Sequence, residues 1–160
     1  MRMHLQISGD VERPQQLSAT DLAAIDAEFQ IPDVSTLDPK RHGQAVKLAG
    51  LLSVVGVRPS AAFLTLHSSA DDFHASIPLD AVRDRAVLIY ALDGEPLPAK
   101  AGGPLRFFIP DFAACQSADV DECANVKFVD HIEFTAVRGR DNRPTDEAEH
   151  AELHRREESH

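Results

Sequence analysis

The sequence has no tryptophan, one tyrosine and only two cysteines among its 160 residues. Its apolar residues are dispersed, and no uninterrupted run approaches the roughly 20 residues that span a bilayer. The opening residues, MRMHLQISGDVERP, also lack the continuous apolar segment of a secretory signal. We therefore expect a cytoplasmic protein with no membrane partner.

Basic residues are scarce as well. The 16 Lys and Arg residues stand against 26 Asp and Glu residues, which gives a formal net charge of -10. Phosphate backbones and anionic lipids repel such a surface, so we expect no affinity for nucleic acid. A site for an anionic small molecule must then depend on a few basic side chains gathered locally.

The two cysteines, Cys115 and Cys123, leave several interpretations open. In a reducing compartment a few cysteines are more often free thiols or metal ligands than a disulfide, although these two are close enough in sequence to pair. A thiol or metal protein built on them is one candidate function. Cys123 is then the candidate metal ligand, alone or with His131.

The remaining residues have the pattern of one mixed α and β domain. A chain of this length can bury about two thirds of the surface of its unfolded form, which is enough for a core without metals or disulfides. Helical spacing predicts a helix that starts after Ser18, is capped with Asp21 and continues to Phe29, and a second helix that ends at Gly56. Apolar alternation or continuous apolar runs predict strands at residues 5–7, 62–67, 73–77, 86–92, 105–109 and 131–137.

The stretch that begins with Gly102 and Gly103 combines flexible backbone with fixed positive charge. Glycines let the main chain approach a ligand closely. Arg106 and Lys127 supply two cations, and Asn125 supplies a hydrogen-bonding side chain. We expect these residues to converge into a small positive cradle. The simpler alternative is that both cations are ordinary charges on a strand surface.

Two other polar segments are read more simply. The basic loop at residues 40–42 could carry binding groups, as polar loops often do, but a solvated loop is the simpler interpretation. Residues 138–160 contain almost no large apolar side chains and cannot bury enough surface to offset the entropy of ordering them. We expect the domain to comprise residues 1–137, followed by a charged, disordered tail.

Several segments follow the order of motifs in one known family. Residues 67–78, HSSADDFHASIP, are similar to its S-A-D-x-(Y/F)-x-x-S-(I/L)-P hairpin. Residues 93–110 give the most specific match to this family, because the segments DGEPLP and GGPLR are similar to its motifs N-G-x-P-L-P and G-G-P-x-R. Over residues 5–137 the chain thus resembles the oxidoreductase molybdopterin-binding domain of the sulfite oxidase family.

This resemblance implies an α+β fold with mixed and antiparallel sheets and a few short helices, and a molybdopterin cofactor bound as an anionic small molecule. Asp71 or Asp72 is then a candidate to grip the guanidine-like edge of the pterin, since a carboxylate can accept paired hydrogen bonds. A plain turn is the alternative for both residues.

The sequence departs from the family in one important respect. Catalytic members hold molybdenum through a cysteine between the first two helices, whereas residues 29–47 here contain none. A thiolate suits a high-valent, sulfur-bound metal, and no residue in this span replaces it directly. Two functions therefore stay open: a molybdopterin-binding domain of an oxidoreductase completed by a protein partner, and a non-catalytic binding or interaction module without molybdenum.

Overall fold

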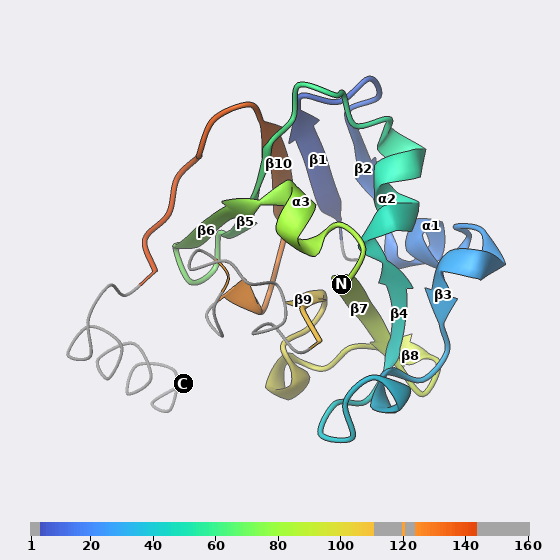
Figure 1. The fold of residues 1–160 in the computed structure, drawn as a ribbon. Helices are drawn as coiled ribbons and strands as arrows, with labels where there is room; N and C mark the ends of the chain where they lie inside the picture. Colours follow the sequence, from blue (N-terminus) through green and yellow to red (C-terminus); the bar gives the residue numbers. More distant parts are fainter. Residues whose placement is uncertain (1–3, 111–119, 121–123, 144–160) are drawn as a thin grey trace.

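The computed structural model describes residues 4–110, 120 and 124–143, which form two five-stranded sheets with short helices (Figure 1). The first sheet has the order β2-β1-β10-β5-β6. Its strands are β1 (Leu5–Gly9), β2 (Gln15–Leu17), β5 (Phe63–Ser68), β6 (Phe73–Pro78) and β10 (His131–Thr135). Strand β10 runs parallel to β1 and antiparallel to β5, so the last strand of the chain is inserted between the first strand and the β5–β6 hairpin.

The second sheet has the order β3-β4-β7-β8, and β9 also pairs with β7. Its strands are β3 (Gln30–Ile31), β4 (Gln44–Lys47), β7 (Val87–Leu92), β8 (Glu95–Pro96) and β9 (Arg106–Phe108). The long apolar run predicted as a buried strand is β7, which lies between β4 on one side and β8 and β9 on the other. The predicted α+β architecture is confirmed.

In the described part of the chain, three short α-helices accompany the sheets: α1 (Ala19–Ala23), α2 (Leu48–Val55) and α3 (Leu79–Val82). The side chains of Ser18 and Asp21 form the predicted capping box at the start of α1. This helix is shorter than predicted, because Nε2 of Gln30 donates to the carbonyls of Leu22 and Ile25, and the chain continues as a 3₁₀ turn, η1 (Ala27–Phe29). Among the described residues, every helix is too short or too polar to cross a bilayer.

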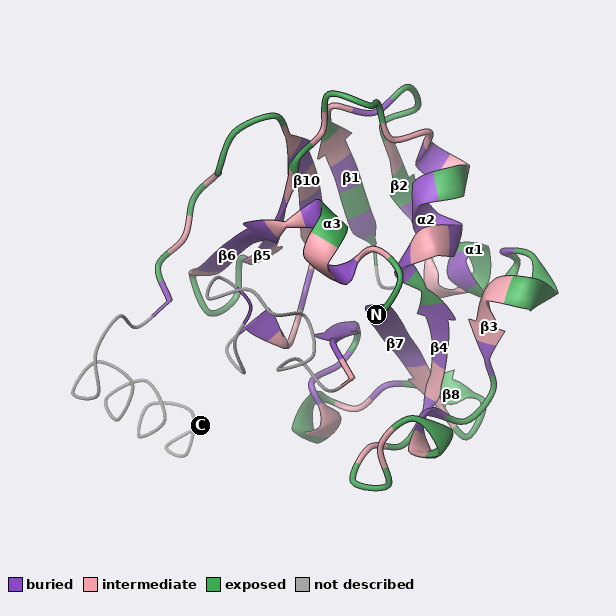
Figure 2. Ribbon diagram, in the orientation of Figure 1, coloured by how far each residue is buried: buried purple, intermediate pink, exposed green. Residues whose placement is uncertain are grey.

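The main hydrophobic core lies between the two sheets and α2, where buried residues are concentrated (Figure 2). Phe134 of β10 and Leu64 of β5 come from the first sheet, and Leu88 of β7 and Phe107 of β9 come from the second. A smaller cluster on the other face of the second sheet contains Phe108. Consecutive residues of β9 thus serve different faces, as strand geometry requires.

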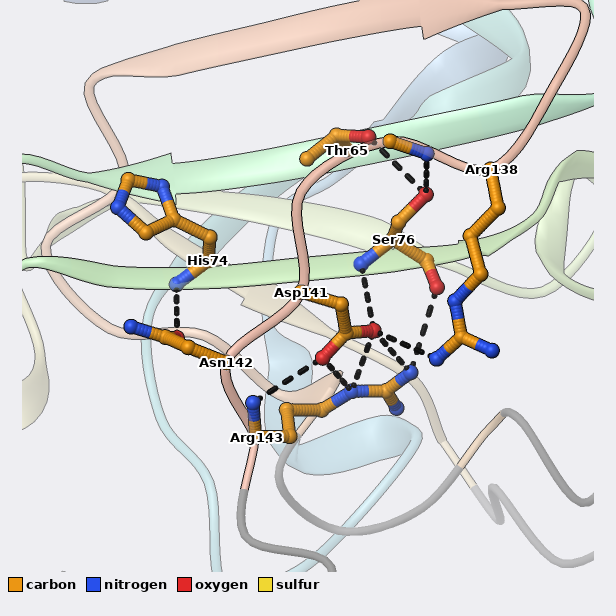
Figure 3. A network of polar contacts seen from close by, with 8 residues as sticks. Thr65, His74, Ser76, Arg138, Asp141, Asn142 and Arg143 are labelled. Carbon is orange, nitrogen blue, oxygen red and sulfur yellow. Dashed lines mark hydrogen bonds and ion pairs between the residues drawn. The ribbon is translucent and has the colours of Figure 1, made fainter.

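Residues 138–143, here called the strap, are packed against the edge of β6 (Figures 1 and 3). The backbone N–H of His74 donates to Oδ1 of Asn142 at 2.8 Å, and the N–H of Asn142 donates back to the His74 carbonyl at 2.9 Å. The N–H of Ser76 donates to Oδ2 of Asp141 at 3.0 Å. The ordered domain therefore extends beyond residue 137, where the sequence predicted the tail to begin. Polar side chains hold the strap to backbone groups, which needs no apolar burial.

Two further 3₁₀ turns complete the described chain. The turn η2 (Val34–Thr36) starts at Asp33, whose side chain accepts from the Ser35 N–H at 2.9 Å. The turn η3 (Ala99–Ala101) ends at Gly102, which has a positive φ of 96°. This second turn brings the chain into the region that the sequence predicted as an anion site.

Candidate functional site

The two halves of the predicted cradle lie side by side. The segment through β9 is hydrogen-bonded to the segment before β10 at both ends, although residues 111–123 separate them in the sequence. The bonds run from the Phe107 N–H to the Val126 carbonyl (2.9 Å), from the Val129 N–H to the Leu105 carbonyl (3.0 Å) and from the Phe128 N–H to the Gly102 carbonyl (2.9 Å).

Gly102 brings the two predicted cations together. A Cβ atom added at this glycine would lie 3.0 Å from Cδ of Arg106 and 3.1 Å from Cγ of Lys127. Both side chains therefore pack over the same glycine, whose φ of 96° also disfavours other residues. The predicted convergence of Arg106 and Lys127 is present in the structure.

Gly103 and Asn125 have structural roles that the sequence did not reveal. A Cβ at Gly103 would overlap the carbonyl of Leu97, so this glycine is required by the chain's own packing. The side-chain oxygen of Asn125 accepts from the Ile109 N–H at 2.7 Å and ties the two segments together just after β9. Direct contact of either residue with a ligand stays a prediction.

Arg106 is enclosed, with 7% of its surface exposed, and its Nη1 donates to the Ala101 carbonyl at 3.4 Å. Phe108 lies two residues further along β9, so its side chain is on the same face of the strand. The guanidinium of Arg41 lies over the Phe108 ring, 5.5 Å from its centroid. Arg41 therefore joins the face of β9 that carries Arg106.

Arg41 was missed by the sequence reasoning, which treated its loop as solvated. Its Nε is buried and has no hydrogen-bond partner among the residues that the structure describes. A buried donor without a partner costs about 1–3 kcal/mol, so such an atom favours an acceptor supplied from outside the described residues. The signal available in the sequence was the basic run at residues 40–42, but its nearness to Phe108 depends on the pairing of β4, β7 and β9.

Asp71 and Asp72 lie at the exposed tip of the β5–β6 hairpin, in the first sheet, whereas β9 belongs to the second sheet. Oδ1 of Asp72 accepts from Nε2 of His74 at 2.9 Å and from Nη2 of Arg140 at 3.3 Å. The hydrogen bond from His74, followed by the charge of Arg140, lowers the pKa of Asp72. These contacts give Asp72 a role in the hairpin and the strap, and its predicted grip on a pterin stays a prediction.

The thiol interpretations fall outside the described residues, because Cys115 and Cys123 both lie there. Within residues 4–110, 120 and 124–143, no group of three or more His, Cys, Asp or Glu side chains is arranged to hold a metal ion. Among the described residues, the candidate anion site consists of Arg106 and Lys127, which pack over Gly102, and of Arg41, which lies over Phe108.

Comparison with known proteins identifies the family to which the chain belongs. Residues 43–142 match the family model of the oxidoreductase molybdopterin-binding domain. The uncharacterized oxidoreductase YuiH of Bacillus subtilis (strain 168) is 29% identical over 141 residues, which cover 84% of this chain and 66% of that protein.

A solved structure has a similar fold. The crystal structure of the sulfane dehydrogenase SoxCD from Paracoccus pantotrophus matches with a TM-score of 0.62 and 20% sequence identity, over 85% of this chain and 39% of that chain. The chain thus spans about two thirds of the YuiH protein and well under half of the SoxCD chain. Because the family match covers more than half of its residues, the chain belongs to the oxidoreductase molybdopterin-binding domain family.

Proposed function

We propose that this chain is the molybdopterin-binding domain of an oxidoreductase and that Arg106 and Lys127 hold the phosphate end of the cofactor. The observation that carries this proposal is the packing of both side chains over Gly102. In a molecule with a net charge of -10, two basic side chains seldom lie together by chance. Here Arg106 and Lys127 both pack over Gly102, whose positive φ favours glycine. Family membership supports the same cofactor class.

The donors present suit such a ligand. A phosphate is bound well by the planar guanidinium of an arginine and by a lysine ammonium used as a point charge. Enclosure of Arg106 strengthens its electrostatic interactions, because the effective dielectric constant is lower than in water. The unpaired Nε of Arg41 adds a third donor on the same face of β9. When bound with its metal, the cofactor would supply two-electron redox chemistry.

A second candidate function is a non-catalytic module that keeps the fold without molybdenum. It is favoured by the absence of cysteine from residues 29–47, a span that here carries Arg41 instead. The catalytic version requires a thiolate from elsewhere, such as Cys123, and we propose that another protein completes the oxidoreductase. Molybdenum content separates the two functions.

The test is to produce the full chain in a host that makes molybdopterin, release bound pterin by denaturation and quantify its oxidised fluorescence and the molybdenum content. We expect pterin near one per chain, and about a ten- to hundredfold loss of retention in Lys127→Gln, as for a hydrogen bond to a charged group. Lys47→Gln, at an exposed lysine of β4, is the matched control. Pterin-free wild-type protein, or unchanged retention in Lys127→Gln, would refute the proposal.

A further inference from the structure

A row of four polar side chains crosses the outer face of the first sheet, opposite the core. Nε2 of His74 is 2.9 Å from Oδ1 of Asp72, Nδ1 of His74 is 2.7 Å from Nδ1 of His67, and Nε2 of His67 is 3.1 Å from Oε1 of Glu133. The row thus runs carboxylate, imidazole, imidazole, carboxylate. None of its four residues packs over Gly102.

Strand register fixes this row. His67 on β5 is directly paired with His74 on β6, and Glu133 lies on the neighbouring strand β10. The two imidazole side chains are only 13% and 9% exposed, so water cannot readily replace their hydrogen bonds. Their protonation must therefore satisfy the contacts that the fold imposes.

The three contacts determine how many protons the two rings hold. An ionised carboxylate only accepts hydrogen bonds, so both Nε2 atoms must carry a proton. The two facing Nδ1 atoms need one proton between them. With two protons, two donors would face each other, and with none, two lone pairs would face each other. The pair then holds three protons, whereas two neutral imidazoles hold two. The complete row requires one positive charge shared by His67 and His74.

The surrounding groups are compatible with a single shared charge. His131 stacks on His67 with ring centroids 4.8 Å apart, and its Nε2 is 2.6 Å from Oγ of Ser8 on β1. Burial, followed by the charge of His67, lowers the pKa of His131, whereas Glu133 and Asp130 oppose that shift. The lowered pKa favours the neutral form of His131.

From the strap, Arg140 contacts the Asp72 end of the row. The carboxylates of Asp72 and Glu133 thus flank the pair, Arg140 contacts Asp72, and the charge of Asp130 acts on the neighbouring His131. Within the part of the chain that the structure describes, these are the charged groups around the pair.

The strap is attached where this row ends. The backbone of His74 exchanges two hydrogen bonds with Asn142, and the carbonyl of Asp72 accepts from Nδ2 of Asn142 at 2.7 Å. We propose that the proton shared by His67 and His74 is a pH-sensitive clasp that fixes the strap to the edge of β6. If the pair binds a fourth proton, both rings are cations and their two Nδ1–H donors face each other. If the pair loses its third proton, two unprotonated Nδ1 atoms face each other with their lone pairs. Docking of the strap is strongest between these limits.

The first test counts the protons by nitrogen NMR of the imidazole rings in the full-length protein at neutral pH. We expect both Nε2 atoms to be protonated, and the two Nδ1 atoms to show chemical shifts between the protonated and unprotonated values, with a scalar coupling across their hydrogen bond. Two fully unprotonated ring nitrogens among the four, in protein with native amide shifts, would overturn the proposal.

The second test measures amide hydrogen exchange at His74 and Ser76, whose N–H groups bond to strap side chains. Glu133→Gln removes a carboxylate that bonds the pair through His67, and we expect exchange at both amides to accelerate roughly tenfold or more. Acidification that stays above about pH 5, and so above the range in which Asp141 is protonated, should accelerate the same two amides in the wild type beyond the intrinsic pH dependence of exchange. Glu28→Gln, at an exposed glutamate of η1, is the control and should change neither. Unchanged protection in Glu133→Gln would contradict the clasp.

Discussion

Substitution of Asp141 tests how the strap contributes to stability. Its carboxylate is 9% exposed and bonds Nη2 of Arg143 at 2.6 Å, while the Arg143 side chain is 6% exposed (Figure 3). Burial alone would raise the pKa of Asp141, but hydrogen bonds from Arg143 and the Ser76 backbone lower this pKa from 3.8 to about 2. Asp141→Asn keeps the shape of the side chain and removes its charge.

The size of the effect follows from the pKa shift. A fall from 3.8 to about 2 corresponds to roughly 2.5 kcal/mol of stability at neutral pH. Because the folded pKa of Asp141 is lowered, this contribution is present above the unfolded pKa and is lost as the pH falls from about 5 towards 2. Asparagine also removes a carboxylate that is ion-paired with the buried cation of Arg143. We expect Asp141→Asn to lower the free energy of unfolding by about 2–4 kcal/mol at pH 7.

Urea denaturation of the wild type and Asp141→Asn between pH 7 and pH 2.5 measures this effect. The difference in the free energy of unfolding should shrink by about 2 kcal/mol across that range. Asp80→Asn is the matched control, because the side chain of Asp80 is 90% exposed and its ion pair with Arg83 should contribute less than about 1 kcal/mol. A difference at pH 7 no larger than that of the control, or one independent of pH, would refute the reasoning.

Two further substitutions test other contacts. Gly139→Ala places a Cβ against the hydroxyl of Thr65, so we expect a loss of about 1–3 kcal/mol in the free energy of unfolding, and equal stability in urea denaturation would contradict this packing. Tyr90→Phe removes the hydrogen bond from the Tyr90 hydroxyl to Oε1 of Gln30 at 2.7 Å and should cost about 1 kcal/mol by thermal denaturation, whereas an unchanged melting temperature would show that this bond contributes nothing net.

Local sequence patterns predicted the elements that depend on neighbouring residues. The Ser18 capping box, the end of α2 at Gly56 and the β5–β6 hairpin are all present. The strap was not predicted, because residues 138–143 bond backbone atoms and polar side chains of β6, more than 60 positions earlier. The composition of this segment alone therefore predicted a charged, disordered tail.

The candidate site was predicted in part for a similar reason. Glycines and cations within one stretch pointed to Gly102, Arg106 and Lys127, which lie together in the structure, and their contact with a cofactor stays a prediction. Arg41 could not be placed, because its position over Phe108 depends on which strands pair. The row from Asp72 to Glu133 depends in the same way on the register of β5, β6 and β10.

The hydrogen bonds between the β9 segment and the segment before β10 have an evolutionary consequence. They fix Ile109 and Asn125, which flank residues 111–123, at a constant separation. Insertions, deletions or substitutions between these two anchors can then be accommodated without displacing Arg106 or Lys127. Selection can therefore alter the sequence of that interval while the positions of Arg106 and Lys127 stay the same.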